Sequence, residues 1–457
     1  MKIAIVNSQI VFPDKNKVIE NGSLLIENGL ITRIDKVKYR YDYSVDMLID
    51  AEEGYLIPGL INHHSHGFTL GPLFPNGAKP ISFEFIFRNL NRHLIQGTTT
   101  LLNLDGFATF EEVEIIKKLH PMNIKMATSY TPLNVKAAML VDGFGIKQIH
   151  KKISLEEIIQ RGAVALGEIG GGGILGGGSA SYLYLPKAIE EKIGKRITTE
   201  QSNNLKIAVL GKSIDPSFTD REKIKIALKE AELEEQISIE EAISIVMDSV
   251  YSSVEVARNG IREAAKMSVK YNIPMIAHNA AASKEVIFEV AKKLGPKLIA
   301  GHSNHMSYTE QEMIDTAKEL KKYGVIIDIL SGDSFKAKQL MTSGQFDATL
   351  QMIEEGLVDL ISTDFMGGNW DSILQVLEAA VIQKKISLPQ AIALATSNVV
   401  KAIPGISPNG GIIEEGKVAD VVILNNKQIS KVKHVFINGI PVILDGIIKI
   451  PKPHWIW

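Results

Sequence analysis

The chain of 457 residues contains no cysteine, so disulfide bonds and thiolate metal ligands are both excluded. Any metal that it binds must be held by His, Asp or Glu. The sequence also lacks an apolar run close to the ~20 residues needed to cross a membrane. Its first residues, MKIAIVNSQIVFPD, lack the charged start, long apolar middle and cleavage site of a secretion signal. We therefore expect a cytoplasmic protein.

An excess of charge of either sign is also missing, because the net charge is only −2. This value argues against a nucleic-acid or an anionic-membrane partner and leaves a small molecule as the expected one. The glycine-rich stretch GEIGGGGILGGGSA has no GxxxxGK[ST] pattern, which argues against a phosphate site. Hydrophobic residues make up 45% of the chain, as in ordinary globular proteins, and a homo-oligomer is left open.

Short strands separated by turns occupy both ends of the chain. Residues 1–57 contain KIAIVNSQIVF and KVIENGSLLIENGLITRID, and the Asn-Gly pairs at Asn21–Gly22 and Asn28–Gly29 predict hairpins. Residues 403–457 contain GKVADVVILNN and KVKHVFINGIPVILDGIIKI, which have the same strand character. We expect the two ends to pair into one small β-sandwich domain.

Residues 58–402 alternate apolar strands with amphipathic helices. After the strand that precedes His64, seven more are predicted: GTTTLLNLD, IKMATSYT, GAVALGEIG, IPMIAHNA, KLIAGHSNH, GVIIDILSG and LVDLISTD. Eight buried parallel strands alternating with helices predict an α/β fold, a TIM (β/α)₈ barrel. A doubly wound sheet is the structural alternative, but no dinucleotide fingerprint follows the first strand.

Residues suited to binding a metal follow several of these strands. They are His64, His66, Glu168, His278, His302 and Asp364. Catalytic residues of barrel enzymes lie at the C-terminal ends of the strands. The intervals fit whole βα units, except that about 75–80 extra residues separate Glu168 from His278. We place this helical insertion at about 175–250 and expect a lid, an oligomer contact or a decoration.

Each of these residues, taken singly, has a simpler interpretation. Asp364 could cap a helix, Glu168 could form a salt bridge, and His278 or His302 could be a hydrogen-bonded core residue. Four imidazoles and two carboxylates at one barrel mouth, however, need compensation for their burial, and a cation provides it. The six residues together therefore predict a metal site. Strand geometry turns His63 away from it.

The stretch PGLINHHSH resembles the PGxxDxHxH signature of the amidohydrolase superfamily, with Asn62 where Asp is usual. The later ligands and the tail LATSNVVKAIPG…GIIEEGKVADVVIL match the same family over nearly the whole chain apart from the insertion. The segments LGEIGGGG, IAHNAAAS and AGHSNH look most like enamidase and related cyclic-amide hydrolases. The resemblance implies one or two divalent metals per chain, Zn first and Fe, Mn or Co as alternatives.

In such a centre, His64 and His66 would hold one metal, His278 and His302 the other, and Glu168 would bridge them. Asp364 would contact the first metal and move a proton from the attacking hydroxide to the leaving nitrogen of a cyclic or linear amide. His305 and Asn279 are the candidate substrate-binding residues.

Two alternatives to this function stay open. Glu168 replaces the lysine that hydantoinase-like relatives carboxylate, and Ala281 stands where the deaminase branch tends to carry Glu. Both features favour a glutamate-bridged hydrolase. The first alternative is a mononuclear N-deacetylase or deaminase on the same scaffold. A catalytically inactive structural relative is the other alternative, although such relatives usually lose ligands.

Overall fold

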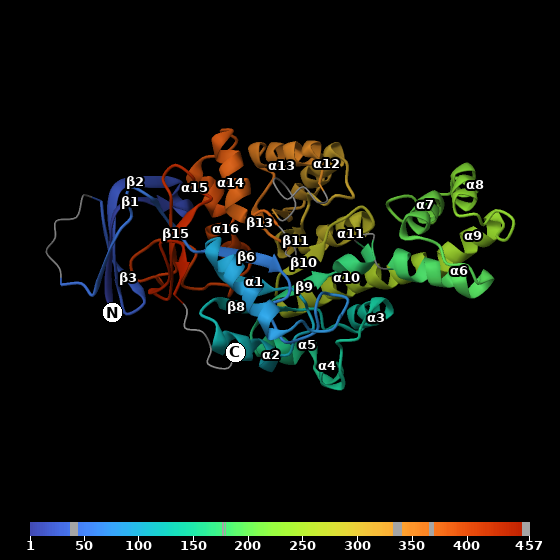
Figure 1. Cartoon of the computed structure of the whole chain (residues 1–457), viewed down its shortest axis with the longest axis horizontal. Coiled ribbons are helices and arrows are strands. Elements are labelled where there is room, and N and C mark those ends of the chain that lie inside the picture. Colours follow the sequence, from blue (N-terminus) through green and yellow to red (C-terminus); the bar gives the residue numbers. More distant parts are fainter. Residues whose placement is uncertain (37–43, 176–177, 179, 332–340, 365–369, 450–457) are drawn as a thin grey trace.

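The computed structural model of the protein describes residues 1–36, 44–175, 178, 180–331, 341–364 and 370–449. Its centre is a parallel barrel whose eight strands are ordered by sequence from β6 to β13, as the sequence predicts (Figure 1). The strands are β6 (Leu60–Ser65), β7 (Thr98–Asn103), β8 (Asn123–Thr128), β9 (Ala163–Ile169), β10 (Met275–His278), β11 (Leu298–Gly301), β12 (Ile326–Leu330) and β13 (Leu360–Ser362). The (β/α)₈ fold is thereby confirmed.

Helices connect the strands on the outside of the barrel. They are α1 (Phe83–Ile95), α2 (Phe110–Leu119), α3 (Pro132–Val141), α4 (Gln148–Lys152), α5 (Leu155–Gln160), α10 (Ser252–Tyr271), α11 (Lys284–Leu294), α12 (Glu310–Lys321), α13 (Ser343–Glu354), α14 (Ile373–Ile382), α15 (Leu388–Ala393) and α16 (Ser397–Ala402). Within the described ranges, none of the helices is both long enough and apolar enough to cross a membrane.

One end of the barrel interior is a solid apolar core. Side chains that alternate inward along the strands form one buried cluster with residues in and after α16: Ile61, Leu102, Ala127, Ala165, Ile276, Ile299, Leu360, Val399, Ile403 and Ile406. Since these residues precede the predicted ligands on their strands, they fill the N-terminal half of the barrel. Polar chemistry is therefore confined to the C-terminal half.

Strands from both chain ends form a second, nine-stranded mixed sheet, at the left of Figure 1. They are β1 (Lys2–Phe12), β2 (Lys17–Glu27), β3 (Leu30–Asp35), β4 (Met47–Asp50), β5 (Tyr55–Pro58), β14 (Val421–Leu424), β15 (Val432–Ile437), β16 (Ile440–Leu444) and β17 (Ile447–Ile448). Side chains from both ends of the chain meet in one buried cluster, among them Ile5, Leu24, Val421 and Phe436. The predicted small β domain is thus present, while its exact boundaries stay a prediction.

One of the two predicted hairpins is wrong. Asn28–Gly29 does join β2 to β3, with Glu27 paired to Leu30. Asn21–Gly22, in contrast, lies inside β2, where the pairing with β1 shifts register. A Cβ at Gly22 would lie 2.5 Å from Ile10 Cδ1, so the glycine permits a close crossing of the two strands. The Asn-Gly pair therefore serves a β-bulge here and not a turn.

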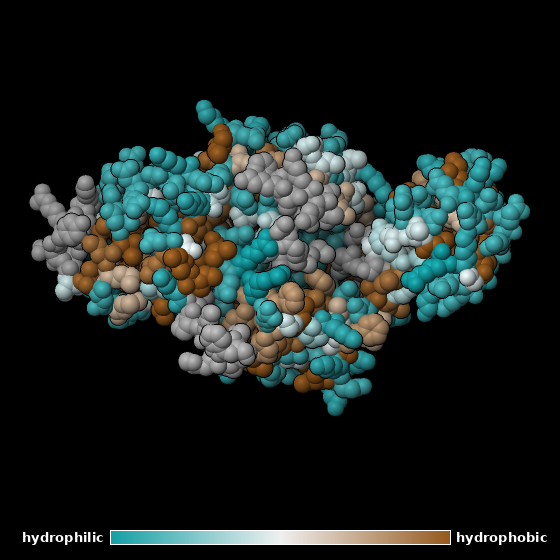
Figure 2. Space-filling model, in the orientation of Figure 1, coloured by the Kyte–Doolittle hydropathy of each residue, from teal (hydrophilic) through white to brown (hydrophobic). Residues whose placement is uncertain are grey.

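The insertion between β9 and α10 forms a helical lobe at the right of Figure 1. It contains α6 (Leu185–Ile193), α7 (Thr199–Leu210), α8 (Arg221–Glu230) and α9 (Ile239–Val246), and the predicted capping box at Ser238–Glu241 starts α9. Figure 2 shows a mostly hydrophilic surface over this lobe. The buried Arg258 of α10 ties it to the barrel by donating hydrogen bonds to the carbonyl oxygens of Ser213 and Ile214. Whether the lobe acts as a lid, an oligomer contact or a decoration stays a prediction.

Asp420 connects the β domain to the barrel. Its Oδ1 accepts a hydrogen bond from the backbone N–H of Asn438 at 2.6 Å, and its Oδ2 accepts one from Asn123 Nδ2, at the start of β8, at 2.8 Å. Burial outweighs these hydrogen bonds and raises the pKa of the Asp420 carboxyl to about 6. The folded protein therefore holds a proton there that the unfolded chain releases near pH 4, so Asp420 lowers stability as the pH rises through this window.

We expect Asp420→Asn to stabilise the protein, and to do so more at pH 8 than at pH 5. Asn keeps an oxygen for the Asn438 N–H, and the Asn123 amide can turn to offer its own oxygen. The linkage relation predicts that the gain grows by roughly 1–2 kcal/mol between the two pH values. Unfolding curves of both proteins at each pH measure it. A gain that is the same at pH 5 and pH 8 would contradict the buried ionisation.

Candidate metal centre

The structure brings the six predicted ligands together at the C-terminal end of the barrel. They come from the ends of five strands: His64 and His66 from β6 and the residue after it, Glu168 from β9, His278 from β10, His302 from the residue after β11, and Asp364 from just past β13. Three overlapping groups of these side chains could each hold a metal ion. Their use as ligands stays a prediction that this geometry supports.

One group consists of His64, His66 and Glu168, and Asp364 lies beside its two histidines. Glu168 Oε2 lies 3.8 Å from His64 Nε2 and 3.7 Å from His66 Nε2. Asp364 Oδ1 lies 3.4 Å and 3.5 Å from the same two nitrogens. Metal–ligand bonds of about 2.0–2.2 Å in a tetrahedron place ligand atoms about 3.3–3.6 Å apart. The two distances to Asp364 fall in this range, and the two to Glu168 are slightly longer.

The second group uses the other oxygen of the same carboxylate. Glu168 Oε1 lies 2.7 Å from His278 Nδ1 and 3.2 Å from His302 Nε2. Glu168 thus presents one oxygen to each pair of histidines. A carboxylate that bridges two metals also directs one oxygen to each, and here Oε1 is within hydrogen-bond distance of both nitrogens of the second group.

Burial makes the cluster costly without a cation. The side chains of Glu168 and of the four histidines are almost fully buried, whereas that of Asp364 keeps 15% exposure. Burial favours the neutral acids, but the facing imidazoles hold the pKa values of both carboxyls below their usual range. Within the described part of the chain, the buried His64 Nε2 has no hydrogen-bond partner. A metal ion between His64 Nε2 and these two carboxylates would give the nitrogen a partner and compensate the buried negative charge.

The carboxylates in turn raise the pKa values of two of the histidines. Burial lowers the pKa of His66, but hydrogen bonds to Asp105 and Asp364 and nearby negative charge raise it to about 10. The pKa of His302 rises to about 9 in the same way, through Glu168 and Asp364. A divalent metal would replace these protons as the compensating positive charge.

Asp105 is a further residue at the site that the sequence did not single out, although it ends the predicted strand GTTTLLNLD. Its Oδ1 lies 3.2 Å from His66 Nδ1, and its oxygens also accept hydrogen bonds from the backbone N–H groups of Gly67 and Phe74. Donation from Nδ1 leaves His66 Nε2 with its lone pair facing the other ligands. A carboxylate of this kind orients a metal-binding histidine and strengthens its ligation.

Asn62, which departs from the family signature, closes the barrel between its first and last strands. Its Nδ2 donates to Thr363 Oγ1 at 2.7 Å, and its Oδ1 accepts the backbone N–H of Thr363 at 3.2 Å. The backbone N–H of Asp364 donates to the His64 carbonyl at 3.0 Å. An ionised carboxylate at position 62 could not donate to Thr363, so the amide suits this closure. The contacts thereby hold Asp364 beside His64.

The helix-cap alternative for Asp364 finds no support in the contacts. The next helix among the described residues, α14, begins at Ile373, and Ser372 caps it by accepting the backbone N–H of Gln375.

The two predicted substrate-binding residues, His305 and Asn279, differ in how they lie at the metal centre. The His305 ring lies 5.3 Å, centroid to centroid, from those of His278 and His302, at the centre itself. The amide of Asn279 is occupied by Ser303 and Tyr308.

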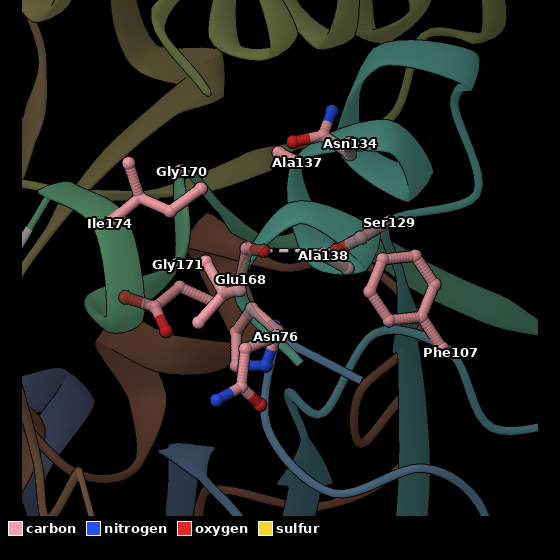
Figure 3. Close-up of a pocket in the computed structure, with 12 residues that line it drawn as sticks. Asn76, Phe107, Ser129, Asn134, Ala137, Ala138, Glu168, Gly170, Gly171 and Ile174 are labelled. Carbon is pink, nitrogen blue, oxygen red and sulfur yellow. Dashed lines mark hydrogen bonds between the residues drawn. The ribbon is translucent and has the colours of Figure 1, made fainter. Parts of the chain in front are cut away.

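Figure 3 shows a cavity beside Glu168, lined by Asn76, Phe107, Ser129, Asn134 and residues of α3. Ser129 Oγ donates to the backbone carbonyl of Glu168 at 2.9 Å, and this contact fixes the main chain behind the carboxylate. The cavity volume of about 20 Å³ holds a single water. This cavity therefore supports Glu168 and is too small for a substrate.

The model of the amidohydrolase family matches residues 55–442, which is most of the chain. The chain belongs to the amidohydrolase family. This membership agrees with the resemblance drawn from the HxH stretch and the later strand-end ligands. The family model leaves the closer likeness to enamidase as a proposal, because it does not distinguish among the branches of the family.

Individual relatives share less with this member of the family. The chain is 40% identical over 67 residues to a 5-methylthioadenosine/S-adenosylhomocysteine deaminase of Bacillus cereus (strain B4264), and the match covers 14% of this chain and 15% of that protein. A β-aspartyl dipeptidase of Fervidobacterium islandicum AW-1 has a similar structure, with a TM-score of 0.55, 15% identity and 98% of each chain covered. So has a Xanthomonas campestris adenosine deaminase solved with bound zinc, with a TM-score of 0.52, 15% identity and 98% and 94% covered. At this identity the likeness shows the fold alone.

Proposed function

We propose that the protein is a metal-dependent hydrolase of a carbon–nitrogen bond, a cyclic or linear amide, in a small molecule. The observation that carries the proposal is the placement of Glu168, whose two oxygens face two separate pairs of histidines. His64, His66 and Asp364 would hold one metal, His278 and His302 the other. Carboxylate and imidazole ligands suit Zn, and equally Fe, Mn or Co.

His64, His66, Glu168, His278, His302 and Asp364 would hold the divalent metal, which would supply a water of lowered pKa as the nucleophile and polarise the amide carbonyl. The role of Asp364 is to accept a proton from the attacking water and to deliver it to the leaving nitrogen. An amine leaves poorly unless it is protonated, so the two transfers make one group both base and acid. The residual exposure of Asp364, the largest among the six ligands, supports its contact with substrate.

His305 would bind the substrate oxygen. Its Nδ1 accepts the backbone N–H of Ser307 at 3.1 Å, so the proton of the neutral ring lies on Nε2. That N–H can donate to a carbonyl held between the His278 and His302 rings and Asp364. Asn279 would act one step further away, because its amide holds Ser303 and Tyr308.

A mononuclear deaminase or N-deacetylase is the second candidate, favoured by the 67-residue match to a deaminase. The likeness of LGEIGGGG and IAHNAAAS to enamidase favours cyclic amides for the first candidate. An inactive structural relative would bind metal weakly or turn over nothing. Metal content and substrate range separate all three.

The experiment is a metal count combined with a substrate panel. The purified protein, stripped by chelator and reloaded with Zn²⁺, should retain about two equivalents and hydrolyse at least one lactam, hydantoin or N-acyl compound. One equivalent together with ammonia release from aminopurines or aminopyrimidines would favour the deaminase. Failure to hydrolyse any panel member with two metals bound would count against amide hydrolysis.

A further inference from the structure

A buried polar layer lies in the barrel between the apolar core and the metal ligands. It consists of His63 of β6, Asp328 of β12 and Ser362 of β13, and all three side chains are fully buried. Strand alternation aligns His63 with Ile61 and Ser362 with Leu360, and both apolar residues belong to the cluster below the layer. The register of β6 shifts between Asn62 and Ser65, and His63, which was expected to turn away from the site, lies inside the barrel together with His64. A carboxylate at this depth requires partners, and its partners reveal its role.

Asp328 links the strands that carry the two groups of histidines. Its Oδ2 accepts the backbone N–H of His302 at 3.0 Å and the hydroxyl of Ser362 at 3.0 Å. Its Oδ1 lies 3.1 Å from His63 Nε2, and its backbone carbonyl accepts the N–H of Ser303 at 2.7 Å. Two successive residues of the loop after β11 are therefore hydrogen-bonded to Asp328.

The backbone of His302 needs such support. His302 has a φ of +36°, in the left-handed region that costs an L-residue free energy. Space around it is also limited: a Cβ on Gly301 would lie 3.2 Å from the His64 ring. The chain thus turns sharply at the point where it delivers His302 Nε2 to Glu168, and the Asp328 carboxylate accepts the N–H exposed by that turn.

We propose that Asp328 is a positioning residue of the metal centre, which holds His302 by accepting its backbone N–H and is itself held by the Ser362 hydroxyl. The inference rests on the metal-dependent function proposed above. It assigns Asp328 a geometric role, through hydrogen bonds, and not the role of an extra negative charge attracting the metal. The two roles predict different behaviour for a neutral residue of the same shape.

Asp328→Asn and Asp328→Leu separate these roles. Asn has an oxygen for His302 and Ser362 and an N–H₂ group that would face His63, but it has no charge. Leu has similar volume and neither acceptor nor charge. Positioning predicts that Asn retains metal affinity within about threefold and that Leu weakens one of the two sites about 10–100-fold, the usual value of a residue that orients a ligand.

Binding of Zn²⁺ and Co²⁺ to the metal-free full-length proteins, in competition with a chromophoric chelator, measures each site without any substrate. The variant His302→Ala identifies which of the two metal-binding sites depends on His302. Asp328→Leu should weaken metal binding at that same site. Asp359→Leu is the control, because Asp359 accepts the backbone N–H of Ile327 at 2.8 Å in the same strand pair, at the N-terminal end of β13 and away from the ligands. It should leave both affinities unchanged.

Equal affinities for the Leu variant and the parent would overturn the proposal, and so would an Asn variant as weak as the Leu variant. Circular dichroism of the metal-free proteins reports whether they fold. If Asp328→Leu does not fold, Ser362→Ala, which removes one of the bonds that hold the carboxylate, should still weaken the His302 site at least threefold, and no change there would refute positioning. A parent protein that binds no metal would instead refute the proposed function.

Discussion

Asp364→Asn should lower kcat by about 10²–10⁴-fold, the usual contribution of a positioned general acid–base group. Asn has the same shape and keeps an oxygen close to His64 and His66, so both metals should stay bound. It cannot accept a proton from water or return one to the leaving nitrogen. The loss should therefore appear in kcat, while the metal content and the melting temperature stay near those of the parent. Steady-state kinetics and metal analysis of the reloaded proteins measure this.

Asp359→Asn provides the matched control, because Asp359 and Asp364 flank the two ends of β13. Asp359 is paired with Lys321 and lies away from the ligands, so its replacement should leave kcat nearly unchanged. If Asp364 were a purely structural residue, Asn would replace it almost as well, since both residues suit caps and turns. Turnover within about threefold of the parent, with both metals bound, would exclude the proton-transfer role.

The grouping of the six candidate ligands at one rim was predictable from the sequence because strand ends converge. Parallel strands in a barrel place their C-terminal ends at one rim, so a His, Glu or Asp at the end of each apolar run marks the site. His64, Glu168 and Asp364 are distant in sequence, and a carboxylate oxygen of both Glu168 and Asp364 still lies within 3.8 Å of His64 Nε2. Because the sequence has no cysteine, only His, Asp and Glu were candidates for metal ligands.

The residues that support the ligands were not predictable, because their role depends on register and on single hydrogen bonds. Asp105 could have been any polar residue after a strand until its oxygen was found 3.2 Å from His66 Nδ1. Asp328 lies within an apolar run, and only the strand order places it beneath His302. The hairpin expected at Asn21–Gly22 failed for a related reason, since the same dipeptide satisfies a bulge as well as a turn.

Glu168→Gln should remove at least one of the two proposed metals. The amide keeps the length of the side chain but replaces one ligand oxygen with an N–H₂ group, which cannot bind a cation. Whichever group of histidines faces that nitrogen loses its shared anionic ligand. The metal affinity of that group should fall by more than about 10–100-fold, which is the usual loss when a residue that only orients a ligand is replaced. Zinc content after dialysis should drop from about two equivalents to one or fewer, and hydrolysis should fall with it.

Glu112→Gln controls for the loss of a glutamate that faces a histidine. Both oxygens of Glu112 lie 3.2 Å from His150 Nε2, outside the centre, so its replacement should leave the zinc content unchanged.

The zinc content of the parent and of Glu168→Gln also distinguishes the two candidate functions. A parent protein that holds one equivalent, lost on Glu168→Gln, would favour a mononuclear deaminase or deacetylase. Two equivalents that survive in Glu168→Gln would refute the bridge, because neither pair of histidines would then depend on the shared carboxylate.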